Sequence, residues 1–182
     1  MRVISGTSRG KKLSSLEGLE TRPTLDRVKE ALFNILQFDI KESKILDLFS
    51  GSGALAIEAL SRGAKEAVLC DSLNKAITII NKNLDATKLK NKAKVLNEDY
   101  LVALNILKKE SKKFDIIFLD PPYKSDYISK SIKKILEYNL LSDDGIIVAE
   151  TDDENKIENI KDIKIYDVRK YGIVHIVFIR KG

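Results

Sequence analysis

The stretch Asp47-Leu48-Phe49-Ser50-Gly51-Ser52-Gly53 decides the fold, and it runs directly into a helical pattern over residues 54–62. The apolar run 44–49 predicts a buried strand that leads into this loop. Small residues allow a ligand to approach the backbone, and the free N–H groups in the first turn of the next helix favour an anionic group. The stretch therefore predicts a strand, loop and helix that bind a nucleotide-like cofactor.

The loop differs from two common nucleotide-binding motifs. Residues 54–57 contain no glycine, so the third glycine of the GxGxxG motif is missing. No Gly-Lys-Ser/Thr follows, which excludes a Walker loop. A nicotinamide-dependent dehydrogenase is therefore disfavoured.

Short apolar runs alternate with helical patterns along residues 44–150. Strands are predicted at 44–49, 66–70, 94–97, 114–119 and 145–150, and helices at 54–62, 74–89, 100–109 and 127–138. This alternation builds a parallel sheet covered by helices. Near the end of the chain, the extended runs 163–171 and 173–180 around Gly172 predict an antiparallel hairpin that closes one edge of the sheet.

The front of the chain has a different pattern. Residues 2–13 predict a small basic hairpin that pivots on Gly6 or Gly10. Thr24 is predicted to cap a helix whose apolar residues follow helical spacing, namely Leu25, Val28, Leu32, Ile35 and Leu36. We expect one α/β domain over residues 1–182. Its N-terminal appendage is 1–40, and its Rossmann-like core, 41–182, is a doubly wound, mostly parallel seven-stranded sheet.

Composition indicates a globular protein of one domain. The chain has 182 residues, of which 43% are hydrophobic and 32% charged, and no apolar run approaches the roughly 18–20 residues that cross a bilayer. Residues 1–6 lack the features of an export signal, and one cysteine, Cys70, can form no internal disulfide. We expect a cytoplasmic monomer without a membrane partner.

Positive charge is concentrated in the front part of the chain. Residues 1–113 hold 21 basic and 14 acidic side chains, whereas residues 114–182 hold 11 and 13, for a net charge of +5 overall. A localised basic surface attracts polyanions, although a lysine-rich solvated surface explains the same count.

Two further acids follow predicted strands. Asp71 lies 24 residues beyond Asp47 at the end of the second strand, where a carboxylate can accept hydrogen bonds from ribose hydroxyls, and Asp99 follows the third, where it can accept from an adenine amino group. Each acid alone is better explained as a helix cap or turn residue, because Asp favours those places. Their joint position at the carboxyl ends of neighbouring strands favours a shared ligand crevice.

Asp120-Pro121-Pro122-Tyr123 directly follows the apolar strand 114–119. The two prolines make a stiff corner that holds a carboxylate, a carbonyl and an aromatic ring together. If Asp120 and the Pro121 carbonyl each accept one N–H of a nucleobase amine while Tyr123 stacks on the base, the nitrogen lone pair is directed at an incoming methyl group. A rigid turn in which Tyr123 merely packs is the alternative.

These segments resemble class I S-adenosylmethionine-dependent methyltransferases, and the whole chain resembles the RsmD family, which methylates the N2 of one guanine in bacterial 16S ribosomal RNA. The resemblance is carried by residues 2–6 and 9–13, 21–34, 47–53, 58–63, 120–123 and 171–172. It implies S-adenosyl-L-methionine as cofactor and 16S rRNA, in the small subunit or an assembly intermediate, as partner.

The resemblance also implies roles for particular residues. The cofactor would be bound by Asp47, Phe49, Ser50, Gly51, Ser52, Gly53, Asp71, Ser72, Asp99, Tyr100 and Thr24. The guanine would be bound by Asp120, Pro121, Pro122 and Tyr123, and RNA phosphates by Arg2, Arg9, Lys11, Lys12, Arg22 and Arg27. Residues 21–27 either line the cofactor or RNA entrance or simply start a helix. Family members often have alanine where Ser50 stands and a second acid where Leu73 stands.

Three alternatives remain open from the sequence. DNA adenine or a protein glutamine amide could be the methylated amine, although Asp rather than Asn at position 120 argues against the amide. A non-catalytic RNA-binding assembly factor on the same fold is the third. Cys70 and His175 are expected to be structural, and we predict no metal site.

Overall fold

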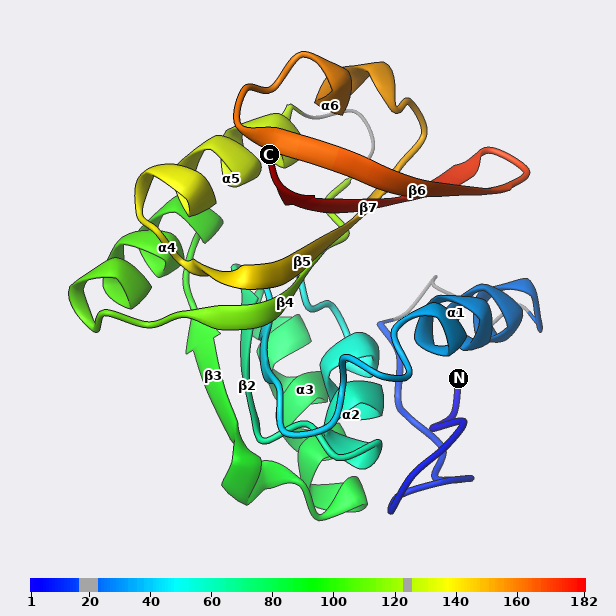
Figure 1. The fold of residues 1–182 in the computed structure, drawn as a ribbon. Helices are drawn as coiled ribbons and strands as arrows, with labels where there is room; N and C mark the ends of the chain where they lie inside the picture. Colours follow the sequence, from blue (N-terminus) through cyan, green and yellow to red (C-terminus); the bar gives the residue numbers. More distant parts are fainter. Residues whose placement is uncertain (17–22, 123–125) are drawn as a thin grey trace.

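The computed structural model describes residues 1–16, 23–122 and 126–182, and these form a seven-stranded sheet with helices on both faces (Figure 1). The strands are β1 (Lys44–Asp47), β2 (Glu66–Asp71), β3 (Ala93–Asn97), β4 (Phe114–Leu119), β5 (Leu141–Thr151), β6 (Ile163–Tyr171) and β7 (Val174–Lys181). Their order is β3-β2-β1-β4-β5-β7-β6. Strands β1 to β5 pair in parallel, whereas β7 is antiparallel to both β5 and β6. The predicted fold class is confirmed.

The helices cover the sheet in two layers. They are α1 (Pro23–Ile35), α2 (Ala54–Ser61), α3 (Asn74–Thr87), α4 (Tyr100–Lys109), α5 (Tyr127–Glu137) and α6 (Asn155–Glu158), with the 3₁₀ turn η1 (Lys90–Lys92) before β3. Helices α1, α2 and α3 lie on one side of the sheet, and α4 and α5 on the other (Figure 1).

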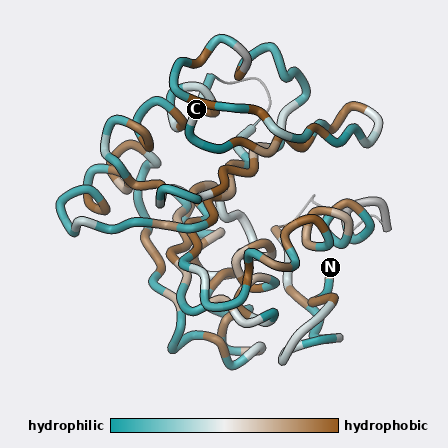
Figure 2. The backbone as a smooth tube through the Cα atoms, viewed as in Figure 1, coloured by the Kyte–Doolittle hydropathy of each residue, from teal (hydrophilic) through white to brown (hydrophobic). Residues whose placement is uncertain are grey.

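Side chains of β4 alternate between two hydrophobic cores. Ile116 and Phe118 belong to the core under α1, α2 and α3, whereas Ile117 and Leu119 belong to the core under α4 and α5. All four are buried, as expected for a central parallel strand. In Figure 2 the hydrophobic colour accordingly concentrates on the inner strands and the hydrophilic colour on the outer turns.

Several element boundaries differ from those predicted, including the following three. Strand β1 ends at Asp47 because the backbone then turns into the glycine loop. Strand β5 begins at Leu141 rather than residue 145, and its pairing with β4 shifts register between Phe114 and Ile116. Ile173 lies outside β7 in the tight turn with Gly172, whose φ of 65° needs the conformational freedom of glycine.

Residues 1–16 are packed into the core rather than attached to its surface. Arg2 and Lys12 form an antiparallel bridge, and Val3 and Leu13 are buried in the same hydrophobic core as the α1, α2 and α3 residues. Buried side chains on both sides of residue 40 share this core. The predicted boundary between the N-terminal appendage and the Rossmann-like core at this residue therefore stays a prediction.

Helix α1 begins at Pro23, so Thr24 lies within its first turn. The prediction that Thr24 caps the helix is therefore wrong. Proline suits the first helical position, because its fixed φ matches the helix and its missing N–H has no partner there in any case.

Candidate active site

A cavity of about 760 Å³ opens at the carboxyl ends of β1, β2, β4 and β5. Most of the predicted site residues line it: Asp47, Phe49, Ser50, Gly51, Ser52, Asp71, Ser72, Asp99, Tyr100, Asp120, Pro121 and Pro122. Gly53 is not among the lining residues, and the side chain of Thr24 is outside the described part of the structure. Tyr123 and Arg22 lie outside the described part of the chain. Segments separated by some 70 residues of sequence thus share one cavity, although the role of each residue stays a prediction.

The glycine loop has a backbone conformation that its two glycines permit. Gly51 and Gly53 have φ angles of 53° and 80°, in the left-handed region. A Cβ on Gly53 would lie 3.0 Å from Leu69 Cδ2, so the loop also needs a small residue where it meets β2. The Ser50 N–H donates to the Cys70 carbonyl at 2.9 Å, and the Ser50 hydroxyl donates to the Asp47 carbonyl at 2.8 Å. These bonds tie the loop to β1 and β2.

Asp71 holds the loop in place from the neighbouring strand. Its two carboxylate oxygens accept hydrogen bonds from the backbone N–H groups of Gly51 and Leu73, each at 2.9 Å. Each carboxylate oxygen has a second lone pair, so these bonds leave capacity for a ribose hydroxyl. Asp71 is therefore both a loop-organising residue and a candidate ligand-binding residue.

Asp99 caps helix α4. Its Oδ1 accepts from the Leu101 N–H at 2.9 Å, and the side chain also lines the cavity. Asp99 is thus both a helix cap and a cavity residue.

Asp47 carries an unpaired buried oxygen at the floor of the cavity. Its Oδ2 accepts from the Ala56 N–H at 3.4 Å, while its Oδ1 is buried and has no hydrogen-bond partner among the described residues. Burial raises the pKa of Asp47 to about 7, partly opposed by hydrogen bonds from Ala56 and Ser50, and the charge of Asp71 raises it further. A buried carboxylate oxygen without a donor fits a ligand that brings both N–H groups and positive charge.

Asp120 directly follows β4 at the carboxyl end of the strand. Its burial within the protein raises the pKa of the carboxyl well above its ordinary value, and repulsion by Glu150 and then Asp47 adds to this shift. The side chain nevertheless has an exposed surface, because it faces the open cavity. Water in the cavity weakens the effect of burial, while the two neighbouring carboxylates keep the pKa of Asp120 raised.

An aromatic cluster forms one wall beside Asp99. Phe49 and Tyr127 stack with ring centroids 6.0 Å apart and an interplanar angle of 6°, and Tyr100 lies 5.4 Å from Phe49 and 5.0 Å from Tyr127. Burial raises the pKa of the Tyr100 hydroxyl. The wall offers a planar apolar surface next to a hydrogen-bond acceptor, as an adenine ring requires.

Sequence reasoning missed several cavity residues, among them Lys29, Tyr127 and Glu150. Glu150 ends the fifth predicted strand, so the rule that pointed to Asp71 and Asp99 could have found it. Tyr127 starts a predicted helix, and Lys29 has the spacing of an ordinary polar helix residue, so neither carried a signal.

The predicted RNA-binding residues lie at two places. Arg2, Arg9, Lys11, Lys12 and Arg27 are all exposed. Arg2 and Lys12 pair beside Met1, which lines the cavity. In contrast, Arg9 and Lys11 flank the turn next to Ser8, which packs on Ser61 at the end of α2 remote from the glycine loop.

The remaining candidate residues support a structural interpretation. Cys70 is buried, its thiol donates to the Glu98 carbonyl at 3.3 Å, and burial raises its pKa to about 12, which leaves it unreactive. His175 lies in β7, 3.1 Å from Glu154.

Within residues 1–16, 23–122 and 126–182, no group of three or more His, Cys, Asp or Glu could bind a metal ion. None of the helices in this part is long and apolar enough to cross a membrane.

The sheet order, the glycine loop and the acids at successive strand ends define a class I S-adenosylmethionine-dependent methyltransferase. A family model described as Conserved hypothetical protein 95 matches residues 1–180, and the chain belongs to this family. S-adenosylmethionine is the methyl donor of such enzymes. Two features of the site fit this cationic cofactor: the unpaired oxygen of Asp47 and the open space at the glycine loop.

Curated relatives and solved structures agree with this assignment. The chain is 40% identical over 182 residues to the putative rRNA methyltransferase YlbH of Bacillus subtilis, covering 100% of this chain and 99% of the relative. It is 36% identical over 177 residues to ribosomal RNA small subunit methyltransferase D of Haemophilus influenzae, covering 96% and 90%. The putative methyltransferase yhhF from Escherichia coli superposes with a TM-score of 0.87 at 33% identity, covering 100% and 97%.

Proposed function

We propose that this protein transfers the methyl group of S-adenosylmethionine to the N2 amine of one guanine in 16S ribosomal RNA of the small subunit. The observation that carries the proposal is the position of Asp120-Pro121-Pro122 on the wall of the same cavity that the glycine loop lines. The relatives named as small subunit rRNA methyltransferases support an rRNA substrate.

Several residues of the cavity would bind the cofactor. The unpaired Asp47 oxygen suits the ammonium group of the methionine end, and Asp71 suits the ribose hydroxyls. Asp99 suits the adenine amino group, beside the rings of Phe49 and Tyr100. When bound, the cofactor supplies an electrophilic methyl group on a sulfonium.

Asp120 would orient the guanine amine and receive a proton from it. Its carboxylate and the Pro121 carbonyl would each accept one N–H of the amine, which leaves the nitrogen lone pair free for an in-line attack. The nitrogen carries an excess proton once its new C–N bond has formed. A carboxylate with a raised pKa is a better acceptor for that proton than an ordinary surface aspartate. Tyr123 is predicted to stack on the base.

The exposed basic residues would contact RNA phosphates. RNA bases are accessible in loops and bulges, so the target guanine would be flipped out to reach the cavity. Arg2 and Lys12 lie near the cavity and Arg9 and Lys11 farther along α2, so together they would follow the RNA backbone away from the flipped base. A monomer acting on an assembled subunit or an assembly intermediate is part of the same proposal.

The test is to incubate the protein with labelled S-adenosylmethionine and 30S particles from a strain that lacks the enzyme, and to map the label. We expect label on one guanine N2, and its loss in the Asp120→Ala variant. The matched control is Asp115→Ala, at an acid of β4, the strand that Asp120 follows; its Oδ2 accepts from the Lys44 N–H, and it does not line the cavity.

Other results would contradict the proposal. Label at another RNA position, equal labelling of DNA, or labelling that survives Asp120→Ala would each do so. RNA binding without cofactor binding by calorimetry would instead indicate a non-catalytic assembly factor.

A further inference from the structure

Asp120 and Glu150 lie at the same level at the carboxyl ends of two neighbouring parallel strands, β4 and β5. Leu119 of β4 pairs in register with Ala149 of β5, so the next residue of each strand comes to the same level. Side chains alternate along a strand, and Phe118 and Val148, two residues earlier, both face the core under α1. Asp120 and Glu150 therefore project to the same side of the sheet, and both line the cavity.

The Glu150 carboxylate is close enough to Asp120 to disfavour its charged form. After burial, the charge of Glu150 is the largest cause of the raised pKa of Asp120. An adjacent pair of carboxylates is a set of acceptors that suits a ligand edge rich in N–H donors.

The surface around Glu150 is apolar and suits a flat ring. Ile176 of β7 pairs with Glu150 in register, and Ile176, Val148 and Val28 all line the cavity. Carboxylates at the rim of such a surface can bind a base by its polar edge while its faces contact aliphatic side chains.

Guanine and adenine differ on the edge that would meet these acids. Guanine places the N1–H directly beside its N2 amine, so these two adjacent positions present only donors. Adenine places the unprotonated N1, an acceptor, beside its N6 amine. A carboxylate next to the amine-binding group therefore attracts guanine and repels adenine, because two acceptors would face each other.

We propose that Glu150 is a specificity-determining residue, whose carboxylate accepts the N1–H of the target guanine while Asp120 and the Pro121 carbonyl accept the N2 amine. This inference rests on the proposed function, in which guanine N2 is the methylated atom. It explains why the acid stands at this strand end, beside the Asp-Pro-Pro corner.

The probe is 2-aminopurine, which has the same N2 amine as guanine but an unprotonated N1. It is placed by RNA ligation at the mapped target position of 16S rRNA in reconstituted 30S particles. We expect the wild-type protein to methylate guanine with a kcat/KM about tenfold or more above that for 2-aminopurine, as expected for loss of one charge-assisted hydrogen bond. In Glu150→Gln, whose amide can donate to N1, this ratio falls by about tenfold or more.

Binding gives a second measurement that is independent of turnover. The fluorescence of 2-aminopurine changes when the base leaves its stack, so a titration yields the Kd for the flipped analogue. We expect Glu150→Gln to bind the 2-aminopurine particle more tightly than the wild type does. Glu150→Ala, which removes the acceptor without adding a donor, lowers the kcat/KM for guanine and leaves that for 2-aminopurine unimproved.

The control is Asp152→Asn, which makes the same chemical change two residues on. The Asp152 carboxylate is ion-paired with Lys156 at 2.7 Å and does not line the cavity. It should leave the guanine to 2-aminopurine ratio unchanged. If the wild type labels a guanine N2 but Glu150→Gln keeps the wild-type ratio, the Glu150 proposal fails and the proposed function stands. If the wild type labels no guanine N2, both fail.

Discussion

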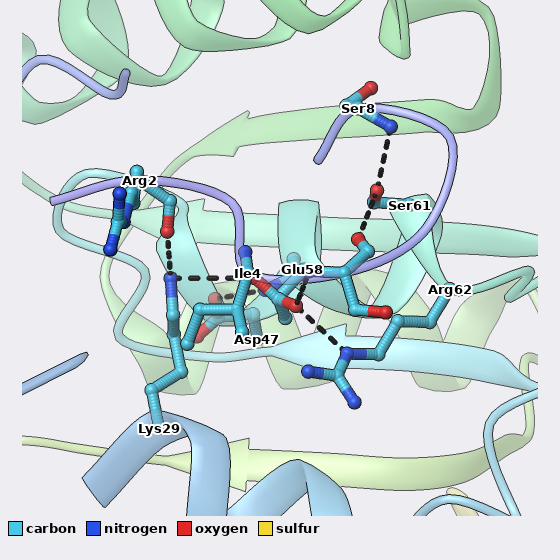
Figure 3. A network of polar contacts seen from close by, with 10 residues as sticks. Arg2, Ile4, Ser8, Lys29, Asp47, Glu58, Ser61 and Arg62 are labelled. Carbon is cyan, nitrogen blue, oxygen red and sulfur yellow. Dashed lines mark hydrogen bonds and ion pairs between the residues drawn. The ribbon is translucent and has the colours of Figure 1, made fainter. Parts of the chain in front are cut away.

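The Lys29 Nζ lies 3.4 Å from the Glu58 Oε2, and this contact joins α1 to α2 beside the cavity (Figure 3). Glu58 is fully buried and also accepts from the backbone N–H groups of Ile4 and Ser5, at 2.9 and 3.0 Å, and from Arg62 Nε at 2.8 Å. Burial lowers the pKa of Lys29, while the Glu58 charge partly restores it. One carboxylate therefore holds the N-terminal segment, α1 and α2 together.

Removing this carboxylate should strongly destabilise the protein. Glu58→Ala removes the carboxylate that both Lys29 and Arg62 contact, and loss of one partner of a buried ion pair costs about 3–5 kcal/mol. The control Glu137→Ala breaks an exposed pair with Lys134 and should cost less than about 1 kcal/mol. Urea unfolding measures both, and a Glu58→Ala cost as small as the control would refute a structural role for the network.

The two glycines of the N-terminal hairpin provide a matched pair. Gly6 and Gly10 have similar positive φ values of 86° and 81°. A Cβ on Gly6 would lie 1.8 Å from the Ser61 carbonyl oxygen, whereas a Cβ on Gly10 would meet no atom within 4 Å. Gly10→Ala should therefore cost only the roughly 1–2 kcal/mol of left-handed backbone strain.

Gly6→Ala should cost several kcal/mol more than Gly10→Ala, because the hairpin must also move away from α2. The difference in unfolding free energy between the two variants isolates the contact from the backbone strain. Equal costs would show that the hairpin does not need its close approach to Ser61.

Cofactor affinity should increase with pH below neutrality. Burial raises the pKa of Asp47 to about 7, so the carboxyl is neutral at pH 5.5 and becomes charged as the pH rises. If the charged form binds the ammonium of the cofactor, the Kd should fall by up to about tenfold per pH unit up to pH 7 and then level off. Calorimetry from pH 5.5 to 7.5 stays below the titration of α-amino groups, at about 7.7–8.0.

Asp47→Asn tests the assignment in two ways. It should bind S-adenosylmethionine more weakly at pH 7.5, and its Kd should vary much less with pH. Without cofactor, the native wild type holds this proton more tightly than the unfolded chain does, so its stability should fall as the pH rises from about 4 to 7. In Asp47→Asn the stability should decrease less over this pH range. Some decrease should remain, because the raised pKa of Asp120 acts in the same direction. An unchanged pH dependence of the Kd would exclude Asp47 as the titrating group.

Much of the core could be predicted from the sequence because its signals are local. The strand 114–119 and the helix 100–109 coincide with β4 and α4, since an uninterrupted apolar run and helical spacing define their ends. The cavity acids Asp47, Asp71 and Asp99 could be found because each lies within two residues of the carboxyl end of a predicted strand.

The rest depends on contacts between distant segments. Nothing local in the sequence indicates that Glu58 would be buried, because its partners Lys29 and Ile4 come from elements 29 and 54 residues away. The N-terminal segment looked like an appendage for the same reason: Val3 and Leu13 become core residues only when α2 lies against them. Lys29 likewise reaches the cavity only through the packing of α1 on the sheet.

The basic hairpin should contribute to RNA affinity and not to cofactor affinity. Arg9 and Lys11 are exposed, whereas Val3 and Leu13 of the same segment are buried, so alanine at the two basic positions removes charge and keeps the packing. The double variant Arg9→Ala/Lys11→Ala should weaken RNA binding. Its slope of log affinity against log salt should decrease by up to about one unit per lost phosphate contact.

The control for this prediction removes two lysines from the opposite face of the sheet. Lys109 and Lys133 are exposed on α4 and α5, so Lys109→Ala/Lys133→Ala makes an equal change in net charge away from the hairpin. Filter binding at several salt concentrations compares the two double variants, and calorimetry measures their S-adenosylmethionine affinity. Equal slopes would mean that total charge attracts the RNA and the hairpin makes no specific contact. A loss of cofactor affinity in the hairpin variant would mean that these side chains support the cavity, which Met1 of the same segment lines.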